Sequence, residues 1–362
     1  YEHASELTNP DAILLRSFKM HDMEIPETVK VIARAGAGVN NIPIDKCTEQ
    51  GIVVFNTPGA NANGVKELVL MGLFMSSRKV LAGINWVKGI AGQGEDVPKL
   101  VEKEKSKFAG PEIKGKTLAV IGLGAIGVMV ANDATALGMN VVGFDPFISV
   151  DAAWGLSRSV QKGISLDAAI ADADYISLHI PLNDETKDIF NSDKFKIMKD
   201  GVRILNFARG ELVNTDALKE ASESGKLACY VTDFPDDEVA QLETVLPIPH
   251  LGASTPESED NCAIMAVNQV REYIESGNII NSVNYPECVL AQSGKFRITI
   301  ANKNVPNIIG QVTQVLAENN INIAEMLNKH RNDYAYNIID TDSEVSEAAV
   351  DKLKEIDGVI MV

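Results

Sequence analysis

The sequence predicts an α/β protein built on parallel β-sheets, with a smaller domain at its C-terminal end. Three observations carry this prediction: short apolar runs that alternate with helical stretches, a glycine-rich turn between a strand and a helix, and a C-terminal βαββαβ pattern. The chain has 362 residues. That is longer than a single hydrophobic core usually supports, so we expect two or three domains.

The middle of the chain holds the clearest strands. Their apolar runs are short and almost continuous, as is typical of parallel strands that are buried on both faces. Residues 91–106 combine glycine with mixed charge and are expected to form an exposed excursion before this sheet begins. The predicted strands are 117–121, 140–144, 175–178, 203–206 and 229–232.

The two flanking zones follow the same reasoning. Residues 1–60 hold apolar runs at 12–15, 29–33 and 52–55, each ending in turn residues, which indicates a further parallel sheet whose strands are separated by helical stretches. Because the chain opens at Tyr1 and soon enters a strand, we expect that some residues precede this numbering. The last zone predicts strands at 296–301, 323–329, 335–340 and 359–362 and helices at 308–319 and 347–356, and it could fold alone.

Composition excludes several classes of function. Hydrophobic residues make up 45% and charged residues 23%, which is ordinary for a globular protein, and the formal net charge is -17. Such an acidic surface repels nucleic acid and anionic lipid, so an anionic substrate would need its own local cluster of arginine and lysine. The four cysteines form no C-x-x-C pair, no secretory signal is visible and the longest apolar run, 68–75, is too short to span a bilayer. We expect a cytoplasmic protein.

A cofactor motif follows the first strand of the middle zone. Gly122, Gly124 and Gly127 form G-x-G-x-x-G between strand and helix, where they permit a tight turn, close approach of a pyrophosphate and close helix–strand packing. Asp145 ends the next strand, where a carboxylate would bind the ribose hydroxyls and repel a 2′-phosphate. The motif alone is weak evidence, but its context predicts a Rossmann-type domain that prefers NAD to NADP.

Three residues are candidates for chemistry. His250 lies in a loop made rigid by prolines and glycine, before a helix that Ser254 or Thr255 could cap. Arg209 follows a buried strand, at the end where doubly wound folds bind ligands. Glu238 lies in an acidic run that would ordinarily be solvated surface. His179, at the end of an apolar strand, is better explained as a structural histidine.

Several blocks of the chain resemble the D-2-hydroxyacid dehydrogenases, over nearly its whole length. They are 33–41, the glycine motif with Asp145, 179–182, 206–210 and 250–255. Within the family the chain is most similar to the phosphoglycerate dehydrogenases. The resemblance implies a discontinuous flavodoxin-like substrate domain at 1–60 and 253–294, a Rossmann domain at 61–252 and an ACT domain at 295–362.

The resemblance also implies the roles of individual residues. Arg209, Glu238 and His250 would be catalytic, since Glu238 stands five residues after Asp233, the family spacing. The chain departs from the family pattern at Val239, where proline is common, in the short stretch before His250, and at Ala125, where arginine is common. The implied cofactor contacts are Gly122, Gly124, Ala125, Ile126, Gly127, Asp145, Ile180, Phe207, Ala208, Asp233, Gly252 and Ala253; the implied substrate contacts are Arg16, Arg34, Gly36, Ala37, Gly38, Asn61 and Lys105.

The same resemblance bears on regulation. In the family the ACT domain can bind L-serine between subunits, and the matching positions are Asn302, Asn304 and Asn322. Asn307 replaces a loop glycine that often takes positive φ, a conformation that asparagine tolerates. The alternative is a dimerisation module without an effector. We expect a homodimer or homotetramer and no metal ion.

The implied reaction is the oxidation of 3-phospho-D-glycerate to 3-phosphohydroxypyruvate, the first step of L-serine synthesis. Alternatives are an enzyme of the same fold acting on glycerate, lactate, a branched 2-hydroxy acid or 2-oxoglutarate, and a non-catalytic NAD-sensing protein. The presence of all three candidate catalytic residues argues against the last.

Overall fold

The computed structural model describes residues 8–362, so His3 and the start of the predicted N-terminal domain lie outside the described residues. The chain divides into two compact units, which we describe separately. Unit 1 comprises Tyr1–Ala60 and Glu259–Val362, and unit 2 comprises Asn61–Ser258. Among the described helices, none combines the length and the apolar character that crossing a membrane requires.

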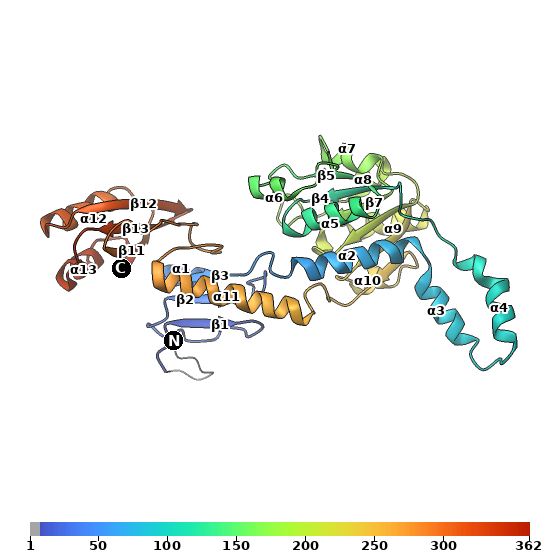
Figure 1. The fold of residues 1–362 in the computed structure, drawn as a ribbon, viewed down its shortest axis with the longest axis horizontal. Helices are drawn as coiled ribbons and strands as arrows, with labels where there is room; N and C mark the ends of the chain where they lie inside the picture. The colour runs from blue at the N-terminus through green and yellow to red at the C-terminus, as the bar shows by residue number, and fades with distance from the viewer. Residues whose placement is uncertain (1–7) are drawn as a thin grey trace. The chain divides into compact units, whose positions relative to one another are not determined.

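Unit 2 is built on a seven-stranded parallel sheet, in the order β10-β9-β8-β7-β4-β5-β6 (Figure 1). One apolar cluster on this sheet includes side chains of α2 and α5, and the other includes side chains of α7, α8 and α9. The strands are β4 (Thr117–Ile121), β5 (Asn140–Phe144), β6 (Gln161–Lys162), β7 (Tyr175–Leu178), β8 (Val202–Asn206), β9 (Leu227–Thr232) and β10 (Val245–Pro247). The helices are α2 (Ala62–Ser77), α3 (Val80–Gly89), α4 (Asp96–Glu104), α5 (Ala125–Ala136), α6 (Val150–Gly155), α7 (Leu166–Ala171), α8 (Ser192–Ile197), α9 (Thr215–Glu223) and α10 (Asp237–Ala240), with 3-10 turns η1 (Lys105–Phe108) and η2 (Gly210–Leu212).

The five strands predicted for this region are confirmed, three of them with their predicted bounds. The sequence did not predict β6 or β10, because two or three residues are too few to give an apolar pattern. The exposed excursion predicted at 91–106 is confirmed, since α4 buries none of its residues, but it begins earlier than predicted, because α3 buries none either. Figure 1 shows both helices away from the sheet.

The N-terminal part of unit 1 is a three-stranded parallel sheet of β1 (Ala12–Leu15), β2 (Val31–Arg34) and β3 (Val53–Phe55). Helix α1 (Ile44–Glu49) connects β2 to β3, but β1 and β2 are joined by turns, so the prediction of a helix between them is wrong. The long helix α11 (Pro256–Ser276) contributes Ala266, Val270 and Tyr273 to the core on this sheet. Thr255 Oγ1 accepts from Ser258 N at 3.1 Å, so Thr255 is the predicted cap of α11.

The C-terminal part of unit 1 confirms the predicted βαββαβ order. Its antiparallel sheet has the order β12-β13-β11-β14, and α12 and α13 share an apolar cluster with it. Asn307 has φ 70°, which confirms the expected positive φ. The elements are β11 (Phe296–Lys303), α12 (Ile308–Glu318), β12 (Ile323–Arg331), β13 (Tyr334–Thr341), α13 (Glu347–Lys354) and β14 (Val359–Met361).

Candidate functional site

The glycine motif forms the turn from β4 into α5, and the backbone explains each glycine. Gly122 has φ 92°, and a Cβ there would lie 2.7 Å from the carbonyl of His179. A Cβ on Gly127 would lie 1.9 Å from Gly122 O, so any larger residue would force the turn apart. Gly124 instead faces open space at the start of α5. The turn therefore fits a phosphate that approaches the helix N-terminus.

Asp145 closes the other side of this turn. Its Oδ2 accepts from Leu123 N within the glycine motif and its Oδ1 accepts from Phe147 N, both at 2.8 Å. The carboxylate is therefore fixed at the C-terminal end of β5, beside the motif, where the sequence predicted it. Ile180 also adjoins the turn, since its Cγ2 would lie 3.0 Å from a Cβ on Gly122.

The loop after β8 holds Arg209 and is organised by a residue to which the sequence assigned no role of its own. Asn206 is fully buried and its Nδ2 donates to Arg209 O at 2.8 Å and to the Tyr230 hydroxyl at 2.9 Å. Its Oδ1 accepts from Ala208 N at 3.2 Å. Phe207 is 7% exposed and packs against Gly72 of α2, so its side chain lies in the core.

Arg209 and His250 converge on one aromatic ring that sequence reasoning missed. The guanidinium carbon of Arg209 lies 5.6 Å from the centroid of the Phe234 ring, and the His250 ring centroid lies 4.5 Å from the same ring. Both polar side chains are exposed. The only available signal for Phe234 was its place directly after Asp233. This arrangement puts a cation and an imidazole on the same surface of unit 2.

Asp233 is a buried carboxylate close to this pair. It is 3% exposed, and its Oδ1 has no hydrogen-bond partner among the described residues. Burial raises the pKa of Asp233, whereas His250, a hydrogen bond from the Gly252 backbone and Arg209 act in the opposite direction. An unpaired buried acceptor is costly, so this oxygen is available to a donor that enters the site.

Glu238 lies elsewhere in the structure than the predicted pair with His250 would require. It is in the first turn of α10, its side chain is 62% exposed, and its Oε2 accepts from Lys219 Nζ of α9. Within the part of the chain that the structure describes, no hydrogen bond or ion pair joins Glu238 to His250. The acidic run around it is exposed, as the simpler interpretation of the sequence had it.

His179 behaves as a structural histidine. Its Nε2 lies 2.8 Å from Ser177 Oγ, and burial lowers the pKa of His179 to about 4. The imidazole is therefore neutral near pH 7 and holds no charge for catalysis.

The predicted substrate contacts divide between the units. In unit 1, Arg34 Nε donates to Arg16 O at 3.1 Å, and Arg16 Nη1 pairs with Glu259 Oε1 at 2.8 Å. Arg34 also lies over the glycine-rich turn, because a Cβ on Gly36 would lie 2.3 Å from its Nη1. The Gly36 amide donates to Thr57 Oγ1 at 2.8 Å and the Ala37 carbonyl accepts from Asn56 Nδ2 at 2.6 Å.

The remaining predicted substrate residues belong to unit 2. Asn61 precedes α2 and makes no side-chain capping bond. Lys105 pairs with Glu102 on the exposed excursion. Neither residue is placed relative to Arg16 and Arg34.

The three asparagines predicted to bind an effector do not share one environment. Asn302 is 2% exposed, accepts from Asn337 Nδ2 at 2.7 Å and donates to Lys303 O at 2.6 Å. Asn304 donates to Asn332 O at 3.3 Å, and Asn322 donates to Asp342 Oδ2 at 2.5 Å. Asn302 is thus already satisfied inside the sheet.

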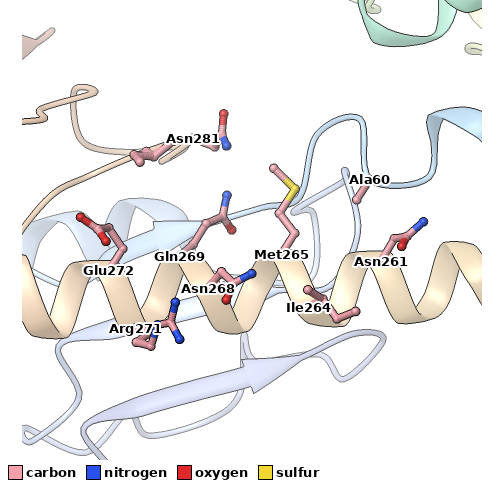
Figure 2. Close-up of a pocket in the computed structure, with 10 residues that line it drawn as sticks. Ala60, Asn261, Ile264, Met265, Asn268, Gln269, Arg271, Glu272 and Asn281 are labelled. Atoms are coloured by element: carbon pink, nitrogen blue, oxygen red, sulfur yellow. The ribbon is translucent and has the colours of Figure 1, made fainter.

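A separate pocket of about 620 Å³ lies in unit 1 along α11 and contains none of the predicted site residues. Figure 2 shows the side chains of Asn261, Met265 and Gln269 on the helix and that of Asn281 on the loop that follows it. Gln269 Nε2 donates to Asn56 O at 3.0 Å, while its Oε1 has no partner among the described residues. Among residues 8–362, no group of three or more histidine, cysteine or acidic side chains could hold a metal ion.

Known proteins resemble both the sequence and this geometry. A D-3-phosphoglycerate dehydrogenase of Archaeoglobus fulgidus is 35% identical over 78% of this chain and 53% of its own length, and a hydroxypyruvate reductase of Thermotoga maritima is 36% identical over 72% and 83%. The crystal structure of NAD⁺-bound 3-phosphoglycerate dehydrogenase of Entamoeba histolytica matches with a TM-score of 0.59 at 29% identity, over 76% of this chain and 82% of that one.

The chain spans 53% and 61% of the lengths of the archaeal phosphoglycerate dehydrogenases that it matches, from Archaeoglobus fulgidus and Methanocaldococcus jannaschii. Residues 70–253 match the NAD-binding domain model of the D-isomer specific 2-hydroxyacid dehydrogenases, and this stretch includes the glycine turn, Arg209 and His250. The chain therefore belongs to the D-isomer specific 2-hydroxyacid dehydrogenase family.

Proposed function

We propose that this protein is an NAD-dependent D-2-hydroxyacid dehydrogenase that oxidises 3-phospho-D-glycerate to 3-phosphohydroxypyruvate, the first step of L-serine synthesis. The observation that carries the proposal is the convergence of Arg209 and His250 on the Phe234 ring, in the same unit as the glycine turn. When NAD is bound, it supplies the acceptor for a hydride.

The residues of this chain supply the rest of the chemistry. The guanidinium of Arg209 can bind the substrate carboxylate by two parallel hydrogen bonds and so fix the position of C2. His250 can take the proton of the 2-hydroxyl as the hydride leaves C2, because a neutral imidazole is a general base near neutral pH. Asp233, buried next to His250, stabilises the imidazolium that forms.

Specificity for a phosphorylated substrate is the finer part of the proposal. Arg16 and Arg34 form a local cationic pair in a chain of net charge -17, next to the turn at Gly36–Gly38 that would bind the carboxylate. Lys105 and Asn61, in unit 2, remain predicted substrate contacts. Relatives that bear the name phosphoglycerate dehydrogenase support this choice, whereas the hydroxypyruvate reductase favours an unphosphorylated acid as the second candidate.

A spectrophotometric assay at about 340 nm, where NADH absorbs, tests both parts. The protein is offered NADH with 3-phosphohydroxypyruvate and, in parallel, with hydroxypyruvate, pyruvate and 2-oxoglutarate. Preference for the phosphorylated acid supports the full proposal, and activity on the unphosphorylated acids alone would retain the dehydrogenase and retire the serine pathway. His250→Ala should lower kcat by about 10²–10⁴-fold with NAD binding little changed, and near-normal turnover would overturn the role of His250.

Regulation and assembly are proposals of the same kind. We infer that the C-terminal βαββαβ domain is an ACT domain, that L-serine binds through Asn304 and Asn322, and that the protein forms homodimers or tetramers in the cytoplasm. Four free, buried cysteines fit a reducing compartment. Titration calorimetry with L-serine that gave no heat, together with unchanged activity, would exclude the effector, and light scattering would give the oligomeric state.

A further inference from the structure

The pocket along α11 contains a buried hydrogen-bond acceptor that no group among the described residues satisfies. Gln269 is 7% exposed, and its Nε2 donates to Asn56 O at 3.0 Å. This bond fixes the orientation of the amide, because a flipped amide would set its oxygen against the Asn56 carbonyl. Gln269 Oε1 has no partner within residues 8–362, and an unpaired buried acceptor is costly. The oxygen therefore marks a place for a ligand that donates a hydrogen bond.

A carboxylate stands next to this acceptor in the same pocket. Glu272 follows Gln269 by three residues, the spacing at which helical side chains are neighbours, with about 5–6 Å between their Cβ atoms. Glu272 Oε1 accepts from Asn278 Nδ2 at 2.7 Å and from Ser276 Oγ at 2.8 Å. These hydrogen bonds lower the pKa of Glu272, so its carboxylate is charged near pH 7. This part of the pocket thus presents an amide oxygen and a negative charge.

The cation that also lines the pocket belongs to another side of the helix. At about 100° per residue, Glu272 lies about 60° around α11 from Gln269, whereas Arg271 lies about 160° around. Figure 2 shows Gln269 and Glu272 as neighbours along the helix. The volume of about 620 Å³ is in the range of small-molecule sites. Apolar side chains complete the wall, namely those of Ile264, Met265 and Ile280.

Access to the buried oxygen depends on a flexible neighbour. Gln269 Oε1 is covered, so a donor reaches it only when an adjacent side chain shifts. Met265 precedes Gln269 by four residues and lines the same pocket, and its unbranched thioether side chain adapts readily. We propose that this pocket binds a small organic cation, a primary ammonium on a short aliphatic chain, whose N–H groups meet Gln269 Oε1 and the Glu272 carboxylate while the chain lies against the apolar wall. The net charge of -17 draws such cations to the protein.

An NMR titration of the full chain with propylammonium tests the proposal, with 1-propanol and propionate as probes of the same length. Propylammonium should shift the side-chain amide signal of Gln269, which its loss from Gln269→Leu identifies. It should bind about tenfold more tightly than 1-propanol, because hydrogen bonds to charged groups are stronger than those between neutral groups. Propionate should not bind. Equal binding of 1-propanol, binding of propionate, or no shift of the Gln269 signal with propylammonium would overturn the proposal.

Glu272→Gln decides the question even if Gln269→Leu does not fold, since a glutamine oxygen still accepts from Asn278 and Ser276. The Kd for propylammonium should rise about fivefold, the scale of a partly exposed ion pair. The matched control is Glu318→Gln on α12, where Glu318 accepts from Gln314 Nε2 at 2.9 Å outside the pocket, and its Kd should stay unchanged. An unchanged Kd in Glu272→Gln, or an equal rise in both variants, would refute the role of the charge. The titration needs neither NAD nor substrate, so its result is independent of the dehydrogenase function proposed above.

Discussion

Asp340 forms the most deeply buried ion pair of unit 1, and replacing it by asparagine is the sharpest test of the C-terminal domain. Its carboxylate is fully buried and accepts from Arg297 Nε at 2.6 Å and Arg297 Nη2 at 2.9 Å, and from Ser293 N at 2.8 Å. Arg297 also donates to the carbonyls of Ser276 and Leu290, at 2.9 and 3.0 Å. One pair therefore joins β11 and β13 to the end of α11 and the segment that follows it.

Asp340→Asn keeps the shape of the side chain but points an amide donor at a guanidinium that is then left unpaired. Breaking a buried pair in this way costs about 3–5 kcal/mol of unfolding free energy. For a unit of this size, that corresponds to a fall in Tm of about 6–20 °C, which differential scanning calorimetry would measure. Asp351→Asn is the control, because Asp351 is 72% exposed and pairs only with Lys354, at 3.7 Å.

The pH dependence of this stability follows from the same contacts. The Arg297 hydrogen bonds hold the pKa of Asp340 below its usual value. A carboxyl whose pKa is lower in the folded state stabilises the fold above its unfolded pKa of about 3.9, and that stability is lost as the pH falls through the folded pKa. The difference between the wild type and Asp340→Asn should therefore be constant near neutrality and shrink below about pH 4. A variant within about 0.5 kcal/mol of the wild type at pH 7 would refute the reasoning.

Three further predictions concern unit 2 and the thiols. Gly127→Ala places a Cβ 1.9 Å from Gly122 O, so the turn must open, and the affinity for NAD measured by fluorescence titration should fall at least about tenfold. In the control Gly89→Ala, the new Cβ has nothing within 4 Å, so the affinity for NAD should stay unchanged. If both variants bind NAD equally well, the role of the turn is contradicted. Asn206→Ala removes the hydrogen bonds to Arg209 O and the Tyr230 hydroxyl, so kcat/KM should fall by about tenfold while the Kd for NAD stays unchanged. A variant that lost only affinity for NAD would argue that Asn206 does not position Arg209. Burial raises the pKa of Cys47, Cys229 and Cys288 to about 11. At pH 8, these thiols should therefore react with a disulfide reagent about 100-fold more slowly than an ordinary cysteine. Rapid labelling of all three in the native protein would be inconsistent with their burial.

Much of the fold could be predicted because its signals are local. Parallel strands buried on both faces appear as continuous apolar runs, and β4, β5 and β7 have their predicted bounds. The glycine turn was equally predictable, since no other residue fits at Gly122 or Gly127. The strands β6 and β10 were missed because they are too short to carry a pattern.

The sequence by itself determined which residue types stand at the ends of the strands: the glycine turn, Asp145, Arg209 and His250. Only the tertiary structure decided which side chains meet. Arg209 and His250 both lie against the Phe234 ring, and the Glu238 carboxylate pairs with Lys219. These contacts depend on side-chain rotamers and on helices α9 and α10 meeting in space. Arg297 and Asp340, 43 residues apart, meet only because β11 and β13 pair in one register. Local pattern fixes an element, whereas long-range packing fixes the partners of its side chains.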